Sequence, residues 1–157
     1  MRTLTPALAH ANICFFKSIN QTGDTLENPM TSATLTFDAH GLADMLDASS
    51  QEQLDTLDYG VIGFDRDGNV QRYNAFESQA AGLSPQRVIG EPLFTNVAPC
   101  LNNFMVAQRF EDAAEEGSEL DDTIDYVLTL RMRPIKVKLR LLASAASATR
   151  YVVVQRR

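Results

Sequence analysis

The sequence has few of the residues that build disulfide frameworks, metal sites and histidine-dependent active sites. It contains two cysteines and two histidines in 157 residues. Two cysteines cannot make a disulfide framework, they form no paired-cysteine metal motif, and in a reducing compartment both are expected to be free thiols. The histidines, His10 and His40, both lie in the N-terminal part. A cysteine hydrolase would therefore lack a base beside its thiol, and haem would lack an axial histidine in the core.

Long apolar runs are absent as well. No stretch approaches the length that a membrane-spanning helix needs, and 45% hydrophobic with 22% charged residues is typical of a soluble globular protein. Residues 7–16 are mildly apolar, but His10 and Asn12 interrupt them and no convincing cleavage site follows. We therefore expect a cytoplasmic protein of ordinary domain size with no membrane partner.

Basic residues are missing from a long segment of the chain. Ile19 to Asp65 contains nine acidic residues and no Lys or Arg, whereas Arg131 to Arg157 contains eight basic residues and no acid. The formal net charge of −6 argues against nucleic acid as a partner. The separation of charge predicts that the N-terminal part docks electrostatically on the last strands.

Residues 1–29 show no clear amphipathic period and contain loop-like clusters. We interpret them either as an extension without fixed structure or as residues that precede a translation start at Met30. After them, Asp38 is expected to cap a helix with Leu42, Met45 and Leu46 on one apolar face. The Ser49-Ser50 pair predicts the start of a second short helix.

The remaining chain predicts strands and helices in a recognisable order. Apolar runs and alternation indicate strands at residues 60–64, 70–73, 123–132, 135–141 and 151–154. An Asp-Gly turn joins the first two strands, and helices are expected at residues 84–89 and 104–116. This order predicts an α+β domain in which a five-stranded antiparallel sheet carries helices on one face.

One stretch combines a tyrosine, a carboxyl group and a cysteine. Tyr73 and Glu77 are four residues apart, so after a strand end their side chains project from one side of a short helix. Cys100 follows proline in the sequence Val97-Ala98-Pro99-Cys100. Taken singly, a tyrosine at a strand end, a helical acid and a lone cysteine are most often structural residues, and none of them identifies a function.

The combination resembles the photoactive yellow protein family, over roughly Phe37 to Arg157. The matching positions are Gly60, Asp67-Gly68-Asn69, Tyr73-Asn74-Ala75, Glu77, Val88-Ile89-Gly90, Val97-Ala98-Pro99-Cys100, Met132, Pro134, Lys136-Val137-Lys138 and the Tyr151 strand. The resemblance implies a PAS fold, with residues 30–58 as an N-terminal cap and residues 59–157 as the PAS core. It also implies a blue-light photoreceptor rather than an enzyme.

The resemblance further implies a cofactor, p-coumaric acid, bound as a thioester on Cys100. Tyr73 and Glu77 would hydrogen-bond its phenolate, and burial beside that charge favours the protonated carboxyl of Glu77. Light would isomerise the cofactor and move the Glu77 proton to it; the buried, unpaired anion left on Glu77 would then release the cap. The expected pocket consists of Cys100, Tyr73, Glu77, Ala81, Leu83, Leu93, Val97, Ala98, Leu128, Leu130 and Met132.

Several pocket positions depart from the usual family pattern. Ala81 replaces a threonine that supports the tyrosine, Leu83 replaces an arginine that covers the ring, and Leu128 and Leu130 replace aromatic residues, while Met132 retains the family methionine. An alternative is a PAS interaction or ligand-sensing module without a covalent chromophore. In either case we expect an unidentified downstream signalling protein as partner, and a monomer or weak dimer.

Overall fold

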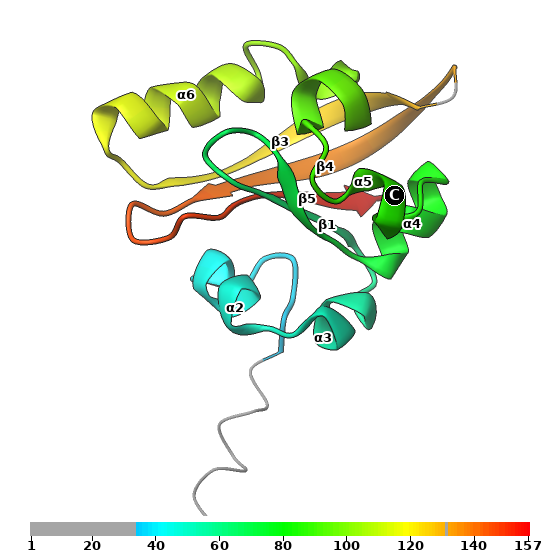
Figure 1. Ribbon diagram of the computed structural model, residues 1–157, viewed down its shortest axis with the longest axis horizontal. Coiled ribbons are helices and arrows are strands. Elements are labelled where there is room, and N and C mark those ends of the chain that lie inside the picture. Colours follow the sequence, from blue (N-terminus) through cyan, green and yellow to red (C-terminus); the bar gives the residue numbers. More distant parts are fainter. Residues whose placement is uncertain (1–33, 131) are drawn as a thin grey trace, which may run out of the picture. The chain divides into compact units, whose positions relative to one another are not determined.

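Five antiparallel strands form the sheet, in the order β2-β1-β5-β4-β3 (Figure 1). The computed structural model describes residues 34–130 and 132–157, and residues 35–157 form one compact unit. The predicted extension, residues 1–29, lies outside the described residues. The strands are β1 (Gly60–Phe64), β2 (Val70–Tyr73), β3 (Leu120–Leu130), β4 (Arg133–Ala143) and β5 (Arg150–Arg156).

The turn between β1 and β2 forms as its Asp-Gly sequence predicts. The Asp65 carboxylate accepts hydrogen bonds from the backbone N–H groups of Asp67 and Asn69, at 3.0 and 2.9 Å. Gly68 has a φ of 87°, in the left-handed region that glycine adopts without steric cost. The hairpin places Tyr73 directly opposite Ile62 of β1.

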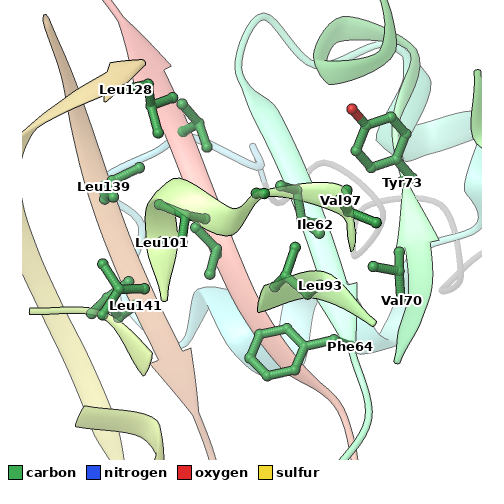
Figure 2. Packing of buried hydrophobic residues seen from close by; sticks show 14 of the residues in the cluster. Ile62, Phe64, Val70, Tyr73, Leu93, Val97, Leu101, Leu128, Leu139 and Leu141 are labelled. Carbon is green, nitrogen blue, oxygen red and sulfur yellow. The ribbon is translucent and has the colours of Figure 1, made fainter. Parts of the chain in front are cut away.

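The central strand β5 divides the core in two, because its side chains alternate between the faces of the sheet. Val152 and Val154 belong to one buried cluster, and Tyr151 and Val153 belong to the other. We call the first side, which includes Ile62, the site face. Figure 2 shows Leu139 and Leu141 of β4 in the same cluster.

The second side, which we call the cap face, is covered by helices α2 (Leu42–Ala48) and α3 (Gln51–Asp55). Figure 1 shows these helices across the sheet from α6. Leu42, Leu46 and Leu54 pack there against sheet residues that include Tyr151 and Val153. The sheet is therefore covered on both faces, whereas the element order alone predicted helices on one face.

The cap helices begin differently from each other. Ser50 caps α3, as the serine pair predicted. The Ser50 side chain accepts a bond from the Gln53 backbone, and the Gln53 side chain accepts one from the Ser50 backbone, which is a capping box. The expected cap of α2, Asp38, is wrong: the N-cap residue is Gly41, with a φ of 66°. Leu42 and Leu46 of α2 are buried, and Met45 is half-buried.

The site face carries the remaining helices and turns. They are α4 (Ala75–Ala81), α5 (Pro85–Val88), the π-helical turn η2 (Leu93–Val97), the 3-10 turn η3 (Pro99–Leu101) and α6 (Ala107–Glu116). The predicted start of α6 at Phe104 is wrong, because Asn103 Oδ1 accepts a bond from Met105 N at 2.9 Å and a turn forms there. Phe104 is 79% exposed. None of the helices in the described part of the chain is long and apolar enough to cross a membrane.

Candidate functional site

A small, mostly apolar cavity lies on the site face, between β1, β2, α4 and the η2–η3 segment. Its volume is about 20 Å³, which is room for roughly one water molecule. Figure 2 shows Tyr73, Ile62 and Val97 on this side of the sheet, with the tyrosine hydroxyl directed away from Val70. The lining residues are Ile62, Tyr73, Glu77, Ala81, Leu83, Val97, Ala98, Cys100, Leu101, Leu128 and Val154.

Tyr73 supplies a buried hydroxyl at the end of β2. This hydroxyl donates to the backbone carbonyl of Glu77 at 3.5 Å, which is the outer limit for a hydrogen bond. Burial raises the pKa of Tyr73 well above its usual range; the charge of Glu77 adds to this and that of Arg156 opposes it. Tyr73 is therefore a neutral donor that is only weakly engaged within the protein.

Glu77 lies in the first turn of α4 and is 3% exposed. Its backbone N–H donates to Asn74 Oδ1 at 3.1 Å, so the asparagine caps the helix and fixes the position of the acid. Gly60 of β1 lies directly beneath the carboxyl group: a Cβ at this position would be 2.0 Å from Glu77 Oε2. The glycine is thus needed for the carboxyl group to lie against β1.

The Glu77 carboxylate forms a two-point ion pair with Arg156 of β5. Nη1 lies 2.7 Å from Oε2 and Nη2 lies 2.9 Å from Oε1, with side chains 14% and 4% exposed. Parallel bonds of this kind match the geometry of an ionised carboxylate. The sequence analysis expected Glu77 without a cationic partner, whereas the structure pairs it with Arg156.

Cys100 brings a half-buried free thiol to the same cavity from the η3 turn. Its backbone carbonyl accepts two hydrogen bonds, from Tyr126 Oη at 2.6 Å and from Asn103 Nδ2 at 3.0 Å. The bond from Tyr126 anchors the turn to β3. Over residues 34–130 and 132–157, no group of histidine, cysteine or acidic side chains is arranged to hold a metal ion.

Comparisons with known proteins identify the family. A family model described as PAS fold matches residues 54–154. The photoactive yellow protein of Rhodothalassium salexigens is 34% identical over 117 residues, which make up 74% of this chain and 90% of that protein. The chain belongs to the photoactive yellow protein family. The photoactive yellow protein of Halochromatium salexigens is 31% identical over 120 residues, 76% of this chain and 95% of its own.

A solved structure agrees with this assignment. The photoactive yellow protein domain of the sensor histidine kinase Ppr from Rhodospirillum centenum is 34% identical. It superposes with a TM-score of 0.66 over 72% of this chain and 98% of that domain. The predicted family and PAS fold are therefore confirmed. Members of the photoactive yellow protein family are photoreceptors rather than enzymes, as the sequence predicted.

Most of the expected pocket residues lie together in the structure of this photoactive yellow protein family member. Those that line the cavity are Tyr73, Glu77, Ala81, Leu83, Val97, Ala98, Cys100 and Leu128. Leu93 does not line it but is fully buried in the adjoining core. The Leu130 side chain is outside the described part of the structure. Met132 is 98% exposed, so the structure does not bring it into the cavity.

Sequence reasoning missed four residues of the site. Ile62, Leu101 and Val154 line the cavity, and Arg156 contacts its acid. The sequence could have indicated Val154 and Arg156, because they follow Val152 at two-residue spacing along β5 and so lie on the same face of the sheet. The expected strand ended at Val154, whereas β5 continues to Arg156.

Proposed function

We propose that the protein is a blue-light receptor that carries p-coumaric acid as a thioester on Cys100. The observation that carries the proposal is that Tyr73, Glu77 and Cys100 line one buried cavity. They come from β2, α4 and η3, so only the fold brings them together. Membership of the photoactive yellow protein family supports this assignment of roles.

The chemistry of the cavity fits a phenolic thioester. Cys100 offers a partly accessible sulfur for the acyl bond, Tyr73 offers a neutral donor, and Glu77 offers a carboxyl group. The present volume of about 20 Å³ is far below the roughly 150 Å³ of an engineered cavity that binds benzene. Loading therefore requires lining side chains to move, and Leu83 and Cys100 are only half-buried.

Each residue has a distinct task in this proposal. The Cys100 sulfur takes the acyl group from an activated thioester, whose own thiol leaves with a proton. When bound, p-coumaric acid supplies blue-light absorption and trans–cis isomerisation. Tyr73 and Glu77 would hold the phenolic oxygen, Tyr73 as a hydrogen-bond donor and Glu77 as the carboxyl group that exchanges a proton with it. The apolar lining, including Ile62 and Leu128, excludes water from this exchange.

A route from Glu77 to the cap supports the proposed cap release. Asn74 Oδ1 accepts from Glu77 N, and Asn74 Nδ2 donates to the Leu54 carbonyl of the cap at 3.0 Å and to the Tyr59 carbonyl at 2.9 Å. Gln51 of α3 donates to the Tyr73 carbonyl at 3.1 Å. A displacement of Glu77 therefore acts on groups that hold the cap.

The output of the receptor follows from the same proposal. We infer that a downstream signalling protein responds to cap release. We further infer that the receptor is a cytoplasmic monomer or weak dimer, and that it needs neither nucleic acid nor a membrane. The second candidate is a PAS module that senses a ligand without a covalent bond. The engagement of Glu77 by Arg156 is the observation that favours this second function.

Reconstitution separates the two functions. The purified chain is incubated with an activated p-coumaric thioester, and visible absorption and intact mass are recorded. The proposal expects a yellow protein that gains one p-coumaroyl group, a colourless Cys100→Ala protein, and a Cys14→Ala protein that behaves like the wild type. Loss of labelling in Cys14→Ala, or equal labelling of both variants, contradicts attachment at Cys100. Failure of all three to bind covalently favours the ligand-sensing module.

A further inference from the structure

Arg156 reaches the cavity's acid from the last strand. It follows Val152 and Val154 at two-residue spacing on β5, so its side chain lies on the site face. Its two Nη atoms lie 2.7 and 2.9 Å from the Glu77 oxygens. A guanidinium keeps its charge at any accessible pH, so this contact places a permanent cation at the site.

A third donor on Arg156 is unused. Its Nε is buried and has no hydrogen-bond partner within the described ranges. A buried N–H without an acceptor costs free energy, so a native structure that contains one calls for a functional or structural reason. The guanidinium therefore has capacity for one more acceptor than Glu77 occupies.

Few other charges face the pair. Helix α4 and strand β1 contain no second ionisable side chain. Tyr73 on β2, Cys100 in η3 and Tyr126 on β3 are the titratable groups around the cavity and its adjoining turn. On β4, Lys136 and Lys138 alternate with the buried site-face residues and so point to the cap face. Among described residues, Arg156 is the cation paired with Glu77.

We propose that Arg156 is the counter-ion of the ligand pocket and holds the site at one negative charge, shared between Glu77 and the acidic oxygen of a bound phenol. This inference rests on the proposed function, since it concerns the same ligand. Glu77, ionised beside Arg156, accepts the proton that a phenol brings, and the phenol oxygen then carries the charge. No net charge enters or leaves, and Arg156 stabilises the anion in either position.

The first test uses the chain without any chromophore. Infrared spectra across a pH series report the ionisation of Glu77, whose band is assigned by subtracting the spectrum of Glu77→Gln. The proposal expects an ionised Glu77 at neutral pH in the wild type and a protonated one in Arg156→Gln, because the buried anion loses its cation. Arg157→Gln is the matched control: Arg157 is adjacent, exposed and paired with Asp125.

The second test uses the loaded chain. The colour of a phenolate is lost when it takes up a proton, so acid bleaching reports how firmly the site holds its negative charge. We expect Arg156→Gln to bleach at a pH at least about one unit higher than the wild type, which is a proton concentration at least about tenfold lower. Arg156→Lys should shift less, and Arg157→Gln should bleach as the wild type does.

The outcomes are distinguishable. If the ionisation of Glu77 follows pH in Arg156→Gln as it does in Arg157→Gln, the counter-ion role is overturned, whether or not the chain binds a chromophore. A wild type that never becomes yellow contradicts the proposed function, while the infrared series still decides the state of Glu77. If Arg156→Gln does not fold, Arg156→Met, which is also neutral and keeps the apolar stem, decides. A Glu77 titration in this variant equal to that of Arg157→Gln contradicts the proposal, and one displaced to higher pH supports it.

Discussion

At the scale of single residues, the Glu77–Arg156 pair dominates the energetics of the site. Both side chains are largely removed from water, and desolvation of two charges offsets much of their attraction. Removing one partner is much worse than removing both, because the remaining group either stays buried as an uncompensated charge or must be neutralised by a proton, and both cost free energy. The pair is therefore weak evidence for stability but strong evidence for a fixed charge arrangement.

This argument gives a prediction for a double-mutant cycle in urea. Arg156→Gln should lower the free energy of unfolding by about 3–5 kcal/mol, and the double variant Glu77→Gln/Arg156→Gln should recover much of that loss. The exposed Arg157–Asp125 pair, with side chains 62% and 78% exposed, is the control and should contribute about 0–1 kcal/mol. Equal coupling energies for the two pairs would show that burial does not matter here.

Gly60 and Gly63 give a second residue-scale prediction. A Cβ at Gly60 would meet Glu77 Oε2 at 2.0 Å on the site face, and one at Gly63 would meet Tyr151 Cε1 at 2.9 Å on the cap face. Both alanine variants should lose about 1–3 kcal/mol by overpacking. Only Gly60→Ala should alter the infrared band of Glu77. An altered band in Gly63→Ala would mean that the two faces are not independent.

At the scale of elements, the cap is held by packing and by arginine–carbonyl bonds. Arg140 Nη1 donates to the Phe37 carbonyl at 2.5 Å, while its Nε and Nη2 pair with Asp121. Arg72 donates to the carbonyls of Leu46 and Ser49. No acid of residues 34–65 forms an ion pair with a base of the last strands, as far as the described residues extend. The expected electrostatic docking therefore involves no direct ion pair, although the pKa of Arg140 is raised by its hydrogen bonds to Asp121 and, to a smaller extent, by the charge of Asp38.

The cap should accordingly depend on Arg140 more than on salt. Arg140→Gln leaves the Phe37 carbonyl without its donor, and we expect a loss of about 1–3 kcal/mol and faster proteolysis between residues 34 and 58. Lys138→Gln, two residues away on the same face of β4, is the control and should cleave as the wild type does. A cleavage rate that rises steeply with moderate salt, and not with Arg140→Gln, would restore the electrostatic explanation.

At the scale of the whole molecule, buried tyrosines on both faces make the fold sensitive to alkali. Burial raises the pKa of Tyr59 from 10.0 to about 12, and it also raises the pKa values of Tyr73 and Tyr151. Between the unfolded and folded pKa values the unfolded chain binds fewer protons, so stability falls as pH rises. The contribution is complete below pH 10 and is lost as pH rises through the folded values.

The alkaline loss can be assigned to one residue. For Tyr59, two pH units correspond to about 2–3 kcal/mol between pH 10 and 12. The Tyr59 hydroxyl donates to the Leu35 carbonyl at 2.9 Å, so Tyr59→Phe should be less stable than the wild type at pH 8. Between pH 10 and 12 the variant should lose less stability than the wild type. Urea midpoints measured across this range test it, and parallel losses in both proteins contradict it.

Much of the site was predictable because its signals are local in the sequence. The four-residue spacing of Tyr73 and Glu77 and the Val97 to Cys100 run indicated a family, and the family implied that they meet. Met132 shows the limit of such transfer: the residue matches, but its φ of 64° and its exposure at the β3–β4 turn place it outside the cavity. Phe104 likewise fits a helical face in sequence, yet a turn held by Asn103 exposes it.

The sequence by itself determined the strand periodicity, the Asp-Gly hairpin, the α+β class and the family, because these depend on neighbouring residues and on local backbone preferences. The tertiary structure alone decided which charged groups meet at the site. Arg156 and Glu77 are 79 positions apart, and their contact depends on which face of the sheet β5 presents and on where α4 lies over β1. Alternation along a strand assigns a side chain to a face, but only packing decides which buried charge it meets there.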